Sequence, residues 1–161
     1  MTIHDFDMAR FLLGKRIVSV HAVASAMVDP KVAELGDIDT ATVLMLTESG
    51  AQVVISNSRR ATYGYDQRIE VAGSAGMVQA ENQRAADIVV ADAQGFHTPP
   101  LLDFFMTRYT EAYAAEIAAF VAALRVEAPV TPTGEDGLKA LELAEAAYAS
   151  LASGAPVSVS V

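Results

Sequence analysis

The middle of the chain holds two consecutive strand-forming segments that are apolar on both faces. Residues 40–47 and 52–57 are rich in Val, Leu, Ile and Met, and Gly50 stands in the short linker where a hairpin turn needs it. An antiparallel sheet usually leaves one face to water and alternates apolar with polar residues. A hairpin that is apolar on both faces needs other parts of the protein to cover each face. This hairpin therefore constrains the fold more than any other segment does.

Further strand signals surround this hairpin. Segments of β-rich composition are expected to form strands within 15–27 and at 67–72, 77–81, 87–91 and 157–161. Strands that follow one another with few helices between them favour an antiparallel meander over alternating βαβ units. We therefore expect an α+β fold with an open, mainly antiparallel β-sheet of about six strands and no Rossmann domain.

Helices are predicted at the two ends of the chain. A short helix is predicted over 3–13, with Gly14 as its left-handed cap, and large apolar side chains recur at helical spacing over 106–125. Thr133 is a candidate N-cap for a further helix that runs to Gly154.

Two long helices can cover only one face of the sheet. We therefore expect the other face to pack against a second copy, which predicts a homo-oligomer.

Composition narrows the class of protein. The chain has 161 residues, enough for one domain over 1–161, and it has no cysteine, which excludes disulfides and cysteine-ligated metals. Its formal charge of -9, with Arg59-Arg60 as the densest basic pair, argues against nucleic acid as a partner. No apolar run approaches the roughly 20 residues that span a bilayer. We expect no membrane partner and a cytoplasmic location.

His4 is the first candidate for chemistry. It stands three residues before Asp7, a spacing that places both side chains on one face of the predicted helix. The carboxylate would orient the imidazole as a general base. The alternative is a solvated histidine near a helix N-terminus, where an aspartate is favoured by the helix dipole. Spacing alone leaves both interpretations open.

Signals for a cofactor or a metal are weak. The turn Gly73-Ser74-Ala75-Gly76 is the nearest approach to a phosphate-binding loop, but it joins a strand to a strand, whereas the dinucleotide fingerprint joins a strand to a helix. We interpret it as a hairpin turn and expect no cofactor to bind this chain alone. The histidines lack a recognisable metal-ligand spacing, so no metal site is expected.

The densest polar and aromatic stretch is 59–68, which includes Tyr63. Tyrosine and arginine there would line a site for a polyol, whose hydroxyl groups need donors and acceptors. The same residue types are enriched at interface rims, and composition does not choose between the two. On spacing, Tyr109 and Tyr113 in the predicted helix over 106–125 are typical of core or interface positions.

Four segments together resemble the C-terminal domain of the Gfo/Idh/MocA oxidoreductases, and among them most of all the inositol 2-dehydrogenases. The segments are IHDFDMARFLLG at 3–14, NSRRATYGYDQRIEV at 57–71, GSAGM at 73–77 and TGEDG at 133–137. The resemblance spans essentially the whole chain. The first two segments are specific as a pair, whereas the glycine turn alone is common.

The resemblance implies an oxidation that uses NAD or NADP. A ring hydroxyl of myo-inositol, or of a similar polyol or sugar, would become a ketone. His4 matches the family's catalytic histidine, which accepts the hydroxyl proton. Tyr63 falls where the family has a substrate-contacting tyrosine, and Tyr109 is a second candidate for such a contact.

Two departures from the family pattern qualify that expectation. The family's catalytic aspartate would fall one residue before Met1, and its lysine and glycine fingerprint belong to a nucleotide-binding domain that these 161 residues do not include. We therefore expect a severed substrate-binding and oligomerisation domain that is inactive alone. The alternatives are a stand-alone, non-catalytic β-sheet module that oligomerises or binds a partner, and a dehydrogenase domain for another sugar.

Overall fold

The computed structural model describes residues 2–126 and 128–159. We expected one domain over the whole chain, and within it the structure contains two compact units. Unit 1 comprises Met1–Arg60 and Thr131–Val161, and unit 2 comprises Ala61–Val130.

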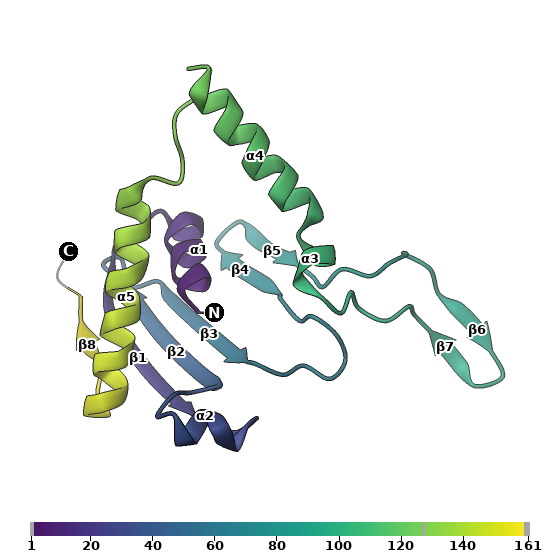
Figure 1. The fold of residues 1–161 in the computed structure, drawn as a ribbon, viewed down its shortest axis with the longest axis horizontal. Coiled ribbons are helices and arrows are strands. Elements are labelled where there is room, and N and C mark those ends of the chain that lie inside the picture. Colours follow the sequence, from purple (N-terminus) through teal and green to yellow (C-terminus); the bar gives the residue numbers. More distant parts are fainter. Residues whose placement is uncertain (1, 127, 160–161) are drawn as a thin grey trace. The chain divides into compact units, whose positions relative to one another are not determined.

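Unit 1 is built on a four-stranded antiparallel sheet with the strand order β3-β2-β1-β8 (Figure 1). Its strands are β1 (Ile17–Ser25), β2 (Thr40–Thr47), β3 (Gln52–Ser58) and β8 (Val157–Ser158). The predicted central hairpin is confirmed as β2 and β3, with Thr40 opposite Ser58 and Leu46 opposite Gln52. β8 covers the first two residues of the strand expected at 157–161, of which Ser160 and Val161 lie outside the described residues.

A shift in the register of β1 places Ile17 and Val20 on the same face of the sheet, toward the core. Between Ile17 and Ser19 the register of the β1–β2 pairing shifts by one residue. Side chains alternate between the faces of a strand, so Ile17 and Val20 would otherwise point to opposite faces. Because of the shift both are buried, at 3% and 0% exposure.

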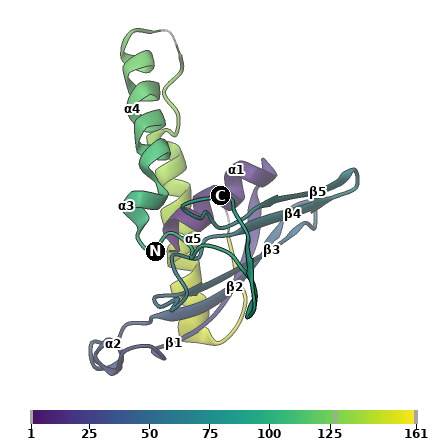
Figure 2. The ribbon, with the colours of Figure 1, turned by 90° about the vertical axis from the view of Figure 1, so that its right-hand side faces the viewer.

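Two helices of unit 1 lie on one face of its sheet (Figures 1 and 2). The first is α1 (Ile3–Leu13), which ends at Gly14 with a φ of 55°, the left-handed cap that the sequence predicted. The second is α5 (Gly134–Ser153), which begins with a capping box between Thr133 and Asp136. A third, short helix, α2 (Pro30–Glu34), which the sequence analysis did not predict, is capped by the Asp29 side chain.

The core of unit 1 lies between these helices and the sheet. It consists of Phe6, Ala9, Ile17, Val20, Ala22, Val43, Met45, Ile55, Leu143 and Ala147. The residues that alternate with these on β2 and β3 point the other way, and Leu44 and Val54 are 40% and 68% exposed. The hairpin is therefore apolar on both faces but covered within unit 1 on only one.

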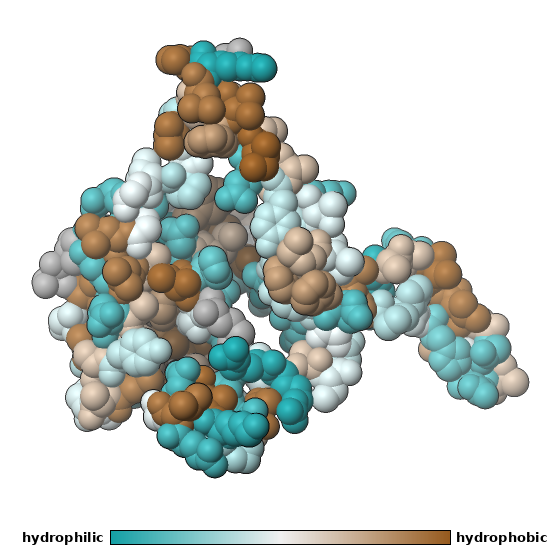
Figure 3. Space-filling model, viewed as in Figure 1, coloured by the Kyte–Doolittle hydropathy of each residue, from teal (hydrophilic) through white to brown (hydrophobic). Residues whose placement is uncertain are grey.

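Unit 2 consists of two hairpins and two helices. The hairpins pair β4 (Ile69–Gly73) with β5 (Gly76–Ala80) and β6 (Val90–Asp92) with β7 (Gly95–His97), and the helices are α3 (Phe105–Arg108) and α4 (Thr110–Leu124). No residue that the structure describes in this unit is buried. Figure 3 shows apolar side chains gathered on α4.

The α+β class and the open antiparallel arrangement are confirmed. The details differ in two places. The strands that we expected in one sheet of about six are divided between a four-stranded sheet and two separate hairpins. The helix expected over 106–125 is broken at Tyr109 into α3 and α4 and belongs to unit 2, so α1 and α5 cover the sheet of unit 1. Over the described part of the chain, no helix is long and apolar enough to cross a membrane.

Candidate active site

His4 lies in the first turn of α1, on the side of the helix that faces away from the core. Phe6 and Ala9 are buried against the sheet, whereas His4 and Phe11 are exposed. The imidazole is therefore accessible from outside unit 1, as a group that exchanges protons with a ligand has to be.

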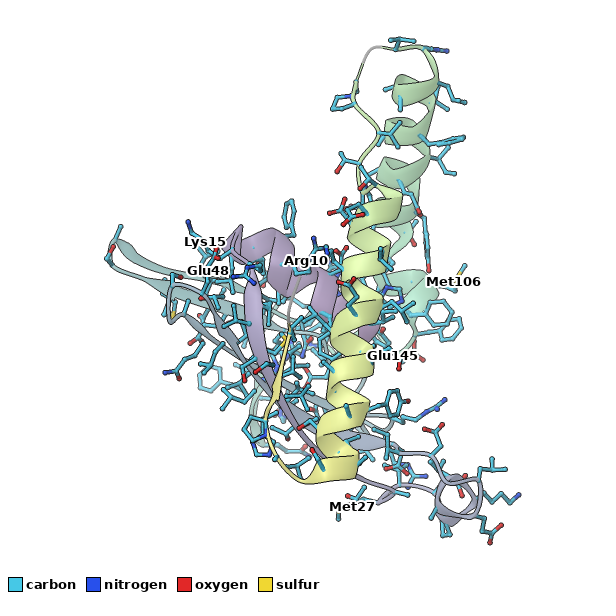
Figure 4. All side chains as sticks on the ribbon, turned by 90° about the vertical axis from the view of Figure 1, so that its left-hand side faces the viewer. Arg10, Lys15, Met27, Glu48, Met106 and Glu145 are labelled. Atoms are coloured by element: carbon cyan, nitrogen blue, oxygen red, sulfur yellow. The ribbon has the colours of Figure 1, made fainter. Side chains whose placement is uncertain are left out.

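Asp7 does not orient His4. Its Oδ1 accepts a hydrogen bond from the Arg10 guanidinium at 3.1 Å. Arg10 also donates to the backbone oxygen of Asp136 at 3.2 Å, so it links α1 to the start of α5 (Figure 4). The predicted pairing of Asp7 with the imidazole is thus replaced by a contact that holds two helices together.

Asp5 is the carboxylate that is coupled to His4. Burial raises the pKa of Asp5, while a hydrogen bond from Asn57 and the positive charge of His4 act in the opposite direction. The Asn57 Nδ2 donates to Asp5 Oδ2 at 3.1 Å. The adjacent positions of His4 and Asp5 hinted at this coupling, but the contact with Asn57 joins residues 52 positions apart and has no local sequence signal.

A hollow of about 260 Å³ lies within unit 1, between the start of α1, the sheet and α5. Its lining includes alanines from β1, β2 and α5, which leave space that larger side chains would fill. Asn57, Arg59 and Tyr148 contribute polar groups to its lining, and the Asn57 Oδ1 is buried with no hydrogen-bond partner among the described residues. His4 is not among the residues that line this hollow.

Tyr63 lies in unit 2, where its hydroxyl group donates a hydrogen bond to Asp66 Oδ2. The Tyr63 side chain is otherwise exposed. This bond raises the pKa of Tyr63, and burial and the negative charge of Asp66 act in the same direction. Hydrogen bonds from Arg68 are the main cause that lowers the pKa of Asp66 to about 2, against a smaller opposing effect of burial.

Tyr109 lies at the centre of an aromatic cluster in unit 2. Its ring meets those of Tyr65 and Tyr113 edge to face, with centroids 5.9 and 6.5 Å away. The Arg108 guanidinium lies 5.4 Å from the centroid of the Tyr109 ring, within the range of a cation–π contact. The arrangement fixes the Tyr109 ring by packing.

Gly64 separates Tyr63 from Tyr65 and allows the chain to approach a neighbouring segment closely. Its φ is +129°, and a Cβ on this residue would stand 2.6 Å from the Cβ of Leu101. The Tyr65 N–H donates to the Leu102 backbone oxygen at 2.8 Å, which holds the two segments together. Only glycine combines this backbone conformation with this contact.

The nearest candidate for a phosphate-binding loop does not have the strand-to-helix geometry of a dinucleotide fingerprint. The turn at Gly73 and Gly76 closes the β4–β5 hairpin, as the sequence predicted, so no helix N-terminus follows it to meet a pyrophosphate. Across residues 2–126 and 128–159, no group of three or more His, Asp or Glu side chains is placed to hold a metal ion.

The three candidate residues are divided between the units: His4 belongs to unit 1, and Tyr63 and Tyr109 belong to unit 2. Comparisons with known proteins relate both units to one family. Residues 1–159 match the family described as "Oxidoreductase family, C-terminal alpha/beta domain".

Individual relatives agree with that match. The chain is 58% identical over 159 residues to an inositol 2-dehydrogenase of Rhizobium meliloti, which covers 99% of this chain and 48% of that protein. It also matches the crystal structure of a myo-inositol dehydrogenase from Corynebacterium glutamicum, with a TM-score of 0.93 and 40% identity over 100% of this chain and 48% of the other.

A third structure contains ligands. It is a scyllo-inositol dehydrogenase from Lactobacillus casei with bound NAD(H) and scyllo-inositol, which matches with a TM-score of 0.88 and 28% identity over 98% of this chain and 46% of the other. The chain thus spans about half the length of the relatives that it matches.

Proposed function

Because this chain belongs to the Gfo/Idh/MocA oxidoreductases, as a C-terminal α/β domain of that family, we propose that it is the substrate-side half of an NAD-dependent inositol 2-dehydrogenase. The reaction would convert a ring hydroxyl of myo-inositol, or of a similar polyol or sugar, into a ketone. The observation that carries this proposal is the 58% identity to an inositol 2-dehydrogenase, which extends over 99% of the chain and so includes both units.

The chain's own contribution to the chemistry would be a proton acceptor. His4 has an exposed imidazole on the outer face of α1, while the other face of that helix is anchored by Phe6 and Ala9 in the core. An anchored helix holds such a group in one position, which general-base catalysis requires. Asp5, the neighbouring carboxylate, is held by the hydrogen bond from Asn57, whereas Asp7 is bound to Arg10.

Tyr63 and Tyr109 would contact the polyol. The exposed Tyr63 ring leaves its hydroxyl group within reach of a ligand, whereas the aromatic contacts of Tyr109 hold its ring in a fixed position. Tyrosine suits this task because it offers an apolar face and a polar tip.

The chain would also assemble with itself through the sheet face that α1 and α5 leave uncovered. Leu44, Leu46 and Val54 are exposed on that face, at 40%, 37% and 68%. A contiguous apolar patch of this kind on a protein surface marks an interaction site. Two copies that met through this same face would form a symmetric pair.

The hydride acceptor would be held outside this chain. The β4–β5 turn joins two strands, unlike a dinucleotide fingerprint, and the relatives extend over about twice the length of the region that matches. We therefore assign to this chain the handling of the polyol and of its proton, and expect it to be inactive alone.

A chimera tests this division of tasks. In it, the chain replaces the matching half of the Rhizobium meliloti inositol 2-dehydrogenase, and NADH formation from myo-inositol is measured for the chimera and for the chain alone. We expect turnover by the chimera and none by the chain. A chimera that folds and binds NAD but oxidises no inositol would contradict the proposed function, and so would turnover by the chain alone.

A further inference from the structure

We propose that Asp66 is a positioning residue that accepts the hydrogen bond of the Tyr63 hydroxyl group, so that the phenolic oxygen meets a ligand only as a hydrogen-bond acceptor. The site would then select a ligand that presents a hydroxyl group as donor at this point. The inference rests on the proposed contact between Tyr63 and a polyol, and it adds the direction of that hydrogen bond and the residue that sets it.

Asp66 is surrounded by donors. Its Oδ1 accepts from Arg68 Nε at 2.8 Å and from Asn82 Nδ2 at 2.6 Å. Its Oδ2 accepts from the second terminal nitrogen of Arg68 at 2.9 Å and from the Tyr63 hydroxyl group. The Asp66 side chain is 15% exposed, so these contacts take most of its surface. Each oxygen of this carboxylate thus accepts two hydrogen bonds, which fills its acceptor positions. An ionised carboxylate has no proton to donate.

The orientation of Asn82 is fixed by the backbone. The Gln67 N–H donates to Asn82 Oδ1 at 2.7 Å, so the oxygen of the amide faces the backbone and its nitrogen faces Asp66. An asparagine turned the other way would place an oxygen against the carboxylate, and both would be acceptors. The backbone therefore ensures that Asn82 donates to Asp66.

The ionised form of Asp66 persists over the range in which proteins work. The pKa of Asp66 is lowered to about 2, chiefly by the hydrogen bonds from Arg68, although partial burial acts to raise it. The hydrogen bond from Tyr63 to this carboxylate raises the pKa of Tyr63. The proton thus stays on the phenol and points to Asp66, which leaves the lone pairs of the phenolic oxygen for a donor from elsewhere.

This geometry discriminates between ligand groups. A polyol hydroxyl can donate to the Tyr63 oxygen. An ether or a carbonyl oxygen at the same point would bring two acceptors together, and it would be rejected because neither has a proton to share.

The first test measures the phenol directly in the 161-residue chain. Tyrosine labelled with ¹³C at the ring carbon that bears the hydroxyl is titrated by NMR, and the Tyr63 signal is assigned by its loss in Tyr63→Phe. We expect Asp66→Asn and Asp66→Ala to lower the pKa of Tyr63. The control is Asp92→Asn, which removes an exposed carboxylate from the β6–β7 hairpin of the same unit and should leave Tyr63 unchanged. An unchanged Tyr63 pKa in folded Asp66 variants would overturn the inference.

Arg68→Gln provides a second variant that keeps the carboxylate and removes its two strongest donors. We expect the pKa of Asp66 to rise toward its ordinary value in this variant, followed by the ¹³C signal of its side chain. No rise would contradict the proposed role of the Arg68 contacts, even if the Asp66 variants failed to fold.

The second test uses the chimera and follows KM for myo-inositol separately from kcat. We expect Asp66→Ala and Tyr63→Phe each to raise KM by about tenfold with little change in kcat, and their combination to do no more than either alone. Asp66→Asn should restore most of the affinity lost in Asp66→Ala, because its amide oxygen still accepts the phenolic proton. A KM that rises in Tyr63→Phe but not in Asp66→Ala would overturn the positioning role. If the unsubstituted chimera is inactive, the proposed function fails, while the tyrosine titration still decides the role of Asp66.

Discussion

The two units of this chain are stabilised in different ways. Every buried residue that the structure describes belongs to unit 1, where α1 and α5 enclose a core with one face of the sheet. The described residues of unit 2 are held by hydrogen bonds such as those around Asp66 and by edge-to-face contacts such as those of Tyr109. A packed core depends on the fit of its side chains, whereas a polar network depends on each donor meeting its acceptor.

This difference matches the tasks that we propose. The proton acceptor, His4, would sit on a helix that the core of unit 1 fixes in place. The proposed polyol contacts would sit in unit 2, where Asp66 and Gly64 set the position of Tyr63 without a core. The substitutions below test whether the contrast between the units is real, beginning with the largest expected effect.

Two phenylalanines give the strongest contrast. Phe6 is 2% exposed in the core of unit 1, and Phe96 is 84% exposed on the β6–β7 hairpin of unit 2. We expect Phe6→Ala to lower the free energy of unfolding by about 3–5 kcal/mol, because it removes a buried ring and leaves a cavity. Phe96→Ala should change it by no more than about 0.5 kcal/mol. Urea unfolding measures both, and equal losses would show that unit 2 has a core of its own.

Ser150 tests a buried polar contact in unit 1. Its Oγ accepts from the Ala22 N–H at 3.0 Å and donates to the Ala155 oxygen at 2.7 Å, and the side chain is fully buried. β8 pairs with β1 only as far as Val20, so Ser150 provides the partner that Ala22 lacks in the sheet. We expect Ser150→Ala to cost about 1–3 kcal/mol of stability.

The matched control for Ser150 is Ser153, which lies on the same helix and is exposed. Its hydroxyl group makes longer contacts, at 3.3 and 3.4 Å. Ser153→Ala should change the free energy of unfolding by no more than about 0.5 kcal/mol. Similar losses in the two variants would mean that burial at Ser150 contributes nothing.

Acid should weaken unit 1 through Asp39. This carboxylate accepts hydrogen bonds from the backbone N–H groups of Met27, Val28 and Asp29 and from the Thr40 hydroxyl group. Burial acts to raise its pKa, but these bonds together lower it from 3.8 to about 2. A lowered pKa means that the stabilisation is complete above pH 3.8 and is lost as the pH falls to about 2.

Asp39→Asn should therefore lower the free energy of unfolding at neutral pH. It should also reduce the further loss between pH 3.8 and about 2. Unfolding by urea at a series of pH values measures both effects. The control is Asp37→Asn, which changes an exposed carboxylate and should leave the loss of unfolding free energy at acid pH as it is in the unsubstituted chain. A decline that is equally steep in Asp39→Asn would contradict the assignment.

The smallest effect on folding is expected on the uncovered sheet face. Val54→Glu should change the free energy of unfolding by no more than about 0.5 kcal/mol, because Val54 is 68% exposed. If that face joins two copies, the added charge should nevertheless abolish their association, as seen by sedimentation equilibrium. Val23 is 66% exposed on β1 and offers a second position for the same substitution. A protein that is already monomeric without substitution would contradict the oligomer that we propose.

The parts of the fold that the sequence predicted are those with local signals. The hairpin of β2 and β3, the Gly14 cap and the Thr133 N-cap each depend on neighbouring residues, and each is confirmed. The break between α3 and α4 at Tyr109 interrupts a continuous apolar spacing, so periodicity alone could not reveal it. The register shift in β1 depends on pairing with β2 and was likewise outside the reach of sequence patterns.

The candidate site shows the same limit. His4 and Tyr63 were found through family motifs, and the helical spacing suggested Asp7 as the partner of His4. That pairing was wrong because Arg10, one turn further along the helix, competes for the same carboxylate and also reaches Asp136 in α5. The contacts of Asn57 with Asp5 and of Asn82 with Asp66 join distant segments, and only the folded chain brings them together.

The most direct test of the account is the rate of inositol oxidation by the chimera after His4→Gln, compared with His97→Gln, which changes an exposed histidine of unit 2. If His4 is the proton acceptor, kcat falls by about 10²–10⁴-fold in His4→Gln while NAD binding is kept, and His97→Gln retains the full rate. A His4→Gln chimera that turns over as fast as the unsubstituted one would show that the proton leaves by another route, and the role of this chain would have to be reconsidered.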